Sequence, residues 1–219
     1  MNNEKYFSSI EEFNKTSPSQ KLILNSLTEL LPTKGNTFGF FFSIIVGFIF
    51  SYIVGTSQDT INILEKITYN LMGVLLALFG CVFSVYSIIL AFLSDSYIKK
   101  LCEIDYDTNS TYLKRSTSYY EAVLFIFFIA IIINIILMLL MNSIEPNYVL
   151  TDNNLINTIL AISCLWIYFS FVFRVIYEIK STIYNTLVLF RSSIAYKLIG
   201  FVKENEVKST SKRNNKRNR

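Results

Sequence analysis

Histidine is absent from this 219-residue chain. The usual proton shuttle of enzymes and the commonest metal ligand are therefore missing, and a zinc-protease HExxH motif is excluded. The sequence also has no GxSxG motif, no phosphate-binding P-loop and no GxGxxG fingerprint. The three cysteines, Cys81, Cys102 and Cys164, lie far apart, so we expect neither a disulfide framework nor a zinc site. From these absences we predict a protein that is not an enzyme and that binds no cofactor or metal.

Charged residues are missing from the centres of the apolar runs, and no run carries paired carboxylates. Asp105 and Asp107 flank Tyr106 in a polar stretch, which we interpret as a solvated loop rather than a metal site. Carriers that couple transport to protons or ions usually have an ionisable group deep in the membrane. The chain also shows no inverted repeat of the kind that builds many transporters. The sequence therefore disfavours a small transporter.

Apolar residues are what the chain has in abundance, with 52% hydrophobic residues and a mean hydropathy of +0.42. Such a composition is too apolar for an ordinary water-soluble domain. Four apolar runs each have about the 20 residues that a helix needs to cross a hydrocarbon core of about 30 Å. They cover residues 36–55, 69–93, 119–141 and 155–174. We therefore predict an all-α integral membrane protein with four transmembrane helices and with amphipathic cytoplasmic helices at both ends.

The distribution of Lys and Arg predicts the topology. The segments before and between the four runs carry 4, 1, 4 and 0 basic residues in turn, and 11 more lie from Arg174 onward. Because positively charged loops stay on the cytoplasmic side, we expect both termini inside and the loops 56–68 and 142–154 outside. The abundance of Ile, Phe, Asn, Lys and Tyr is typical of AT-rich genomes and favours a bacterial source. The predicted location is thus the plasma (inner) membrane, crossed several times.

We divide the chain into a cytoplasmic N-terminal amphipathic segment (1–35), a transmembrane domain (36–176), a helical extension (177–203) and a basic disordered tail (204–219). In the first segment Ser9 and Glu12 have capping-box spacing. A second apolar face follows over Leu22–Leu31, before Pro32 and Gly35 interrupt the chain.

The predicted extension carries apolar residues at spacings of three and four, which trace a stripe on a helix. They are Ile176, Ile179, Ile183, Leu187, Phe190, Ile194, Leu198 and Phe201. Such a stripe must be covered by copies of itself, by Leu22–Leu31 or by the membrane surface. We favour self-association as a stalk beneath the membrane.

Small residues recur along one face of each of the first two spans. They are Gly39, Ser43, Gly47, Ser51 and Gly55 in the first, and Gly73, Ala77, Gly80, Ser84 and Ser87 in the second. Small side chains let helix backbones approach closely, so such faces mark helix interfaces in membranes. Two interpretations stay open. The two spans pack against each other, or the groove faces the axis of an oligomer, where serine hydroxyls line a narrow passage.

Polar residues in the third and fourth spans suggest two further sites. Asn134 lies near the bilayer centre, where an amide needs a partner and either joins helices or lines a pore. Asp95, Glu121, Arg174 and Glu178 share the cytoplasmic depth, and Arg174 and Glu178 have the i, i+4 spacing of a helical ion pair. This charge cluster is either interfacial anchoring or a cytoplasmic gate that attracts cations.

The basic tail is a candidate site for anionic partners. Its C-terminal basic residues are Lys212, Arg213, Lys216, Arg217 and Arg219. Anionic lipid attracts such residues by about 1 kcal/mol each near the membrane surface. A cytoplasmic protein is a second candidate partner. Nucleic acid is a weaker one, because the tail has no aromatic residue on which bases could stack.

The layout as a whole has four compact spans, both ends inside and helical cytoplasmic extensions. It resembles the membrane subunits of some bacterial antiphage defence systems, such as Kiwa. The resemblance covers the architecture of the whole chain and no specific motif, so it assigns a role to no residue. It implies an oligomeric membrane component that senses infection or perturbs the membrane together with a separate cytoplasmic partner.

These observations predict a homo-oligomeric membrane channel or pore-type effector that is gated through its cytoplasmic helices. Four spans of one chain pack too tightly to enclose water, so a conduction path needs several copies around an axis. The alternative is a non-conducting scaffold or sensor subunit, anchored in the membrane, that recruits a cytoplasmic partner.

Overall fold

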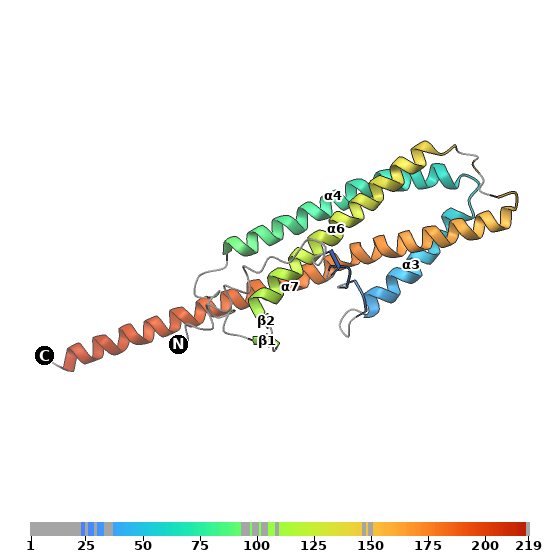
Figure 1. The fold of residues 1–219 in the computed structure, drawn as a ribbon. Coiled ribbons are helices and arrows are strands. Elements are labelled where there is room, and N and C mark those ends of the chain that lie inside the picture. Colours follow the sequence, from blue (N-terminus) through green and yellow to red (C-terminus); the bar gives the residue numbers. More distant parts are fainter. Residues whose placement is uncertain are drawn as a thin grey trace. The chain divides into compact units, whose positions relative to one another are not determined.

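Four long helices dominate the computed structural model of the chain (Figure 1). They are α3 (Thr37–Gly55), α4 (Thr60–Phe92), α6 (Tyr112–Ser143) and α7 (Asn154–Arg217). All four are long and apolar enough to cross a membrane, which confirms the predicted four helical spans and indicates a multi-pass membrane protein. The structure describes residues 23–24, 26–28, 30–32, 37–92, 97, 101, 105–107, 110–145, 148 and 151–217.

The connection between α3 and α4 is a tight turn, much shorter than the loop expected over residues 56–68. The Thr60 hydroxyl donates hydrogen bonds to the carbonyls of Val54, at 3.0 Å, and Ser57, at 2.8 Å. Helix α4 then begins well before its apolar run, because Leu64 and Thr68 are buried against the other helices. Because α4 begins with several polar residues, hydropathy alone predicts its start too late in the sequence.

Helix α7 begins at a side-chain cap. The Asn153 side chain accepts a hydrogen bond of 3.0 Å from the Leu155 amide, as a residue at a helix N-terminus commonly does. From there the helix continues unbroken to Arg217 and includes most of the tail for which the composition predicts disorder. The sequence has no proline after Pro146 and a single glycine, Gly200, in this region, so no residue stops the helix.

The chain divides into two compact units. The first, here called the bundle unit, comprises Thr16–Ser84 and Ser118–Thr182. Its core is apolar: Leu75, Val123 and Phe127 belong to one cluster, and Leu165 and Phe169 belong to another. These clusters bring together residues from α4, α6 and α7, so the bundle unit positions the polar groups described below.

The second unit, here called the extension unit, includes Val85–Thr117 and the part of α7 from Ile183 onward. It contains a small antiparallel pair of strands, β1 (Asp105–Asp107) and β2 (Ser110–Thr111). The stretch expected to be a solvated loop around Asp105 and Asp107 is therefore β1. Tyr97 is buried in this unit, and its ring centroid lies 5.9 Å from that of Tyr196 on α7.

Candidate functional site

The small-residue face of α3 is covered by α7. Gly39, Ser43, Gly47, Ser51 and Gly55 are all buried. A Cβ atom added to Gly47 would lie 2.6 Å from the backbone nitrogen of Ser170 and 2.8 Å from its Cα, closer than real Cβ contacts come. At Gly55 an added Cβ would lie 2.6 Å from the side chain of Ile162. The glycines therefore allow α3 and the fourth span to approach closely, whereas one of the two interpretations left open by the sequence made the second span the neighbour.

An aromatic contact holds the same two helices together. The indole nitrogen of Trp166 donates a 3.0 Å hydrogen bond to the carbonyl of Ile44, and its ring stands edge-on to Phe48 at 5.7 Å. The serine hydroxyls of the α3 face bond to their own helix: Ser43 to the Gly39 carbonyl at 2.7 Å and Ser51 to the Phe48 carbonyl at 2.8 Å. In the bundle unit this face thus serves helix packing.

The small-residue face of α4 is open. Gly73, Ala77, Gly80 and Ser84 are all exposed. Nothing lies within 4 Å of a Cβ atom added at Gly73 or Gly80. The buried side of α4, with Leu75, points the other way. Ser87, which continues the pattern in sequence, is exposed too. The two small-residue faces therefore differ: the chain itself covers that of α3 and leaves that of α4 uncovered.

Asn134 joins three helices in the interior of the bundle unit. Its side chain is fully buried on α6. The amide nitrogen donates a 2.9 Å hydrogen bond to the carbonyl of Thr68 on α4, and the amide oxygen accepts a 2.6 Å bond from the hydroxyl of Tyr168 on α7. Asn134 is thus placed as an internal joint. Sequence reasoning missed Thr68, although it lies seven residues before the buried Leu75 and so on the same side of α4.

Arg174 and Glu178 form a buried ion pair on α7. Their side chains are 5% and 4% exposed, and Nη1 of Arg174 lies 2.7 Å from Oε2 of Glu178. The Arg174 Nε also donates a 3.0 Å hydrogen bond to the carbonyl of Leu30. The Tyr119 hydroxyl on α6 donates a 3.0 Å bond to Oε1 of Glu178. A buried ion pair requires such additional hydrogen bonds, since desolvation of the two charges is costly.

The predicted charge cluster has two other members. Glu121 is half-buried on α6, and Asp95 lies outside the described residues. Sequence reasoning missed the Tyr119 hydroxyl and the Leu30 carbonyl. The Leu30 carbonyl is a backbone group, so no residue type in the sequence could have indicated it. The ion pair therefore ties the N-terminal segment, α6 and α7 to one another.

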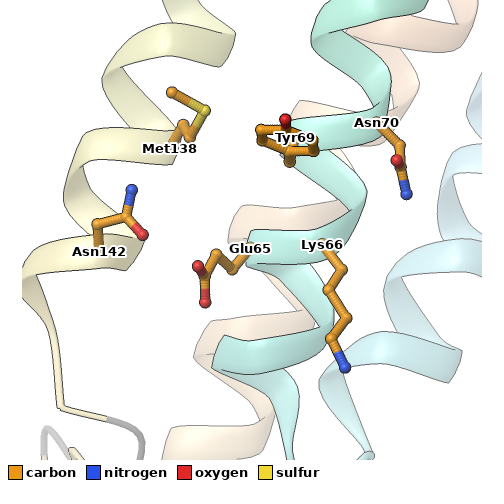
Figure 2. Close-up of a pocket in the computed structure, with 6 residues that line it drawn as sticks. All are labelled: Glu65, Lys66, Tyr69, Asn70, Met138 and Asn142. Atoms are coloured by element: carbon orange, nitrogen blue, oxygen red, sulfur yellow. The ribbon is translucent and has the colours of Figure 1, made fainter.

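A shallow pocket of about 470 Å³ lies between α4 and α6 (Figure 2). Glu65 and Tyr69 are on the side of α4 that faces Asn142 and Met138 of α6, and Lys66 lies on the opposite side of α4 (Figure 2). Asn70 completes the lining. The pocket mixes one acid and one base with amides, so it offers a polar surface without a preference for one charge.

Metal ligands do not gather in the part of the chain that the structure describes: no group of three or more Cys, Asp or Glu residues could hold an ion there. Cys81 and Cys164 are free thiols and exposed. Of the basic residues proposed for anionic partners, Lys212, Arg213, Lys216 and Arg217 lie on the last turns of α7, whose side chains are not described. Arg219 lies outside the described residues.

Comparison with known protein families, curated proteins and solved structures gives no match for this chain. Its function therefore has to be argued from its own residues.

Proposed function

We propose that the protein is a homo-oligomeric membrane channel or pore-type effector whose copies meet along α4. The observation that carries this proposal is the exposed small-residue face of α4, made of Gly73, Ala77, Gly80 and Ser84. The equivalent face of α3 is filled by another helix of the same chain. A face of the same composition that stays open on α4 is suited to a helix from another copy.

Membrane physics supports an interface on this face. Lipid supplies no hydrophobic force between helices, so close backbone approach is a main source of helix association, and small residues permit it. The spacings of four, three and four residues between Gly73, Ala77, Gly80 and Ser84 follow a heptad seam. Helices that pair along such a seam cross at about +20°, the commonest arrangement in membrane bundles. A ring of α4 helices would leave small side chains toward its axis.

The interior of one chain offers a poor path for ions. The α3 face is filled by α7, and Asn134 is hydrogen-bonded to Thr68 and Tyr168. A conduction path would therefore run between copies, where Ala77 and Ser84 are available to line it.

The gate, in this proposal, is the Arg174–Glu178 pair. Arg174 bonds to Leu30 in the N-terminal segment, and Glu178 receives the Tyr119 hydroxyl of α6. A signal that moves the N-terminal segment would thus act directly on α6 and α7. We place this pair at the cytoplasmic side of the inner membrane, with both termini inside, because of the distribution of Lys and Arg. A role in antiphage defence is part of the proposal through the resemblance in layout alone.

A non-conducting scaffold or sensor subunit is the second candidate. The hydrogen bonds inside the bundle unit favour it, because Asn134, Tyr168 and the Thr68 carbonyl bond to one another. Among the buried side-chain nitrogen and oxygen atoms of the described residues, only the Ser170 hydroxyl has no partner. In that case the four helices would hold the cytoplasmic parts in place for a partner protein.

The test is the native mass of the full-length protein in detergent, followed by ion flux in liposomes. We expect a discrete oligomer that conducts. Gly80→Leu should abolish both properties, because it fills the α4 face at a position where an added Cβ atom meets nothing within 4 Å. Val74→Leu, at an exposed position to one side of that face, is the matched control and should keep both. A silent monomer would overturn the channel, and an oligomer without flux would favour the scaffold.

A further inference from the structure

Within the extension unit, α7 has one covered face and one open face of opposite character. The covered face carries Thr186, Leu189 and Ser193, all buried. The open face is a stripe of five apolar residues that are between 48% and 62% exposed, here called the α7 stripe: Ile183, Leu187, Ile194, Leu198 and Phe201. A helix that packed only within its own chain would bury the apolar face first. The described residues cover a face with two hydroxyl side chains and leave the α7 stripe open, which favours a partner outside the chain.

The spacing of the apolar residues limits what that partner is. From Ile183 to Phe201, with the half-buried Phe190 included, they follow one another at steps of 4, 3, 4, 4 and 3 residues, as in an 11-residue repeat. Ile176 and Ile179, which precede them, pack against the core clusters of the bundle unit. Three helical turns of about 3.67 residues each give a right-handed coiled coil with a slight supercoil. A repeat of this kind is matched along its whole length by an identical helix in the same register and direction. We infer that the α7 stripe binds the α7 stripes of further copies of this chain, as a parallel coiled coil.

The exposed surface is large enough for such an interface when the copies are already held together. If each of the five side chains has an area of about 150 Å² and is half exposed, the α7 stripe offers on the order of 400 Å² per copy to an interface. Two copies would then bury about 800 Å², close to the roughly 1,000 Å² of a specific interface. Copies anchored side by side in one membrane meet at high effective concentration, so a modest interface is sufficient. This part of the inference rests on the proposed homo-oligomer.

Two basic residues beside the α7 stripe predict how the association responds to salt. The exposed Arg191 and Lys197 flank the α7 stripe. In a parallel assembly these like charges would repel each other, so added salt should strengthen the association.

Disulfide crosslinking of the full-length protein in membrane vesicles tests the inference. In a background where Cys81, Cys102 and Cys164 are replaced by serine, Leu187→Cys and Ile194→Cys should form dimers on oxidation, because each residue meets itself in a parallel coil. Ser192→Cys and Ala195→Cys, exposed positions off the stripe, are the controls and should crosslink at least several-fold less. Crosslinking at the stripe should rise between low and high salt.

Two outcomes would overturn the inference. The first is crosslinking that is absent or equal at stripe and control positions. The second is a fluorophore at Leu187→Cys that spin-labelled lipid quenches strongly, since this would place the stripe in the membrane. The result is separable from the channel proposal. Stripe-specific dimers in vesicles that show no ion flux would support the coiled coil and overturn the channel. A conducting oligomer without stripe-specific dimers would support the channel and overturn the coiled coil.

Discussion

The hydroxyl of Tyr168 donates a 2.6 Å hydrogen bond to the side-chain oxygen of Asn134, and the side-chain nitrogen of Asn134 donates a 2.9 Å bond to the Thr68 carbonyl. A single amide thereby connects α4, α6 and α7 through its two ends. The partners lie 34 and 66 residues away in the sequence. These hydrogen bonds therefore depend on the tertiary arrangement of the bundle unit, and their contribution to stability can be measured by mutation.

Removing the amide should destabilise the bundle modestly. We expect Asn134→Leu to lower the free energy of unfolding by about 1–2 kcal/mol, the usual value of an interhelical hydrogen bond in a membrane. Tyr168→Phe should cost less, because Asn134 keeps its bond to Thr68. In a double-mutant cycle measured by unfolding in mixed detergent micelles, the coupling should be about 0.6–1.7 kcal/mol. Strictly additive effects would mean that the two side chains do not interact.

The two small-residue faces should respond differently to one added methyl group. Gly47→Ala places a Cβ atom 2.6 Å from the Ser170 backbone, so we expect a loss of about 1–3 kcal/mol in the free energy of unfolding. Gly73→Ala meets open space and should leave the stability of the monomer unchanged or raise it, because alanine favours helix over glycine. Equal effects of the two substitutions would contradict the packing of α3 on α7.

The ion pair should behave as a unit. Glu178→Met removes the buried Arg174–Glu178 ion pair, and the loss of one member of such a pair costs about 3–5 kcal/mol. Replacing both residues by methionine removes both charges and should restore much of that loss. The measurement is the thermal unfolding of the two single variants and the double variant in the same detergent. A loss in the double variant equal to the sum of the two single losses would show that the charges are not coupled.

Trp166, the only tryptophan, lies on α7 against α3, so its fluorescence reports on the contact between these two helices. It contacts Phe48 and the Ile44 carbonyl, so α3 shields one side of its ring. We expect brominated lipid to quench its fluorescence more strongly in Gly47→Leu, where α3 is displaced, than in the wild type. In Gly73→Leu the quenching should match the wild type. Identical quenching in all three proteins would show that Gly47→Leu leaves α3 in place.

The sequence was sufficient for the four helices because each carries a long apolar run. It could not identify the helix that covers α3, since a row of glycines predicts a close neighbour but not which one. The stripe from Ile183 to Phe201 shows the same limit. Periodicity indicates the face that favours burial, whereas the chain covers the face with Thr186 and Ser193. The tail was expected to be disordered from its charge, yet it lacks residues that stop a helix.

The bond from Arg174 to the N-terminal segment ends on a main-chain oxygen, that of Leu30. Every amino acid carries that oxygen, so another residue can replace Leu30 without loss of the bond. A deep mutational scan would consequently register this attachment as intolerance at Arg174 and find only the ordinary preference for an apolar residue at position 30. The bond between α7 and the N-terminal segment would therefore produce no covariation between residues 30 and 174 in a sequence alignment.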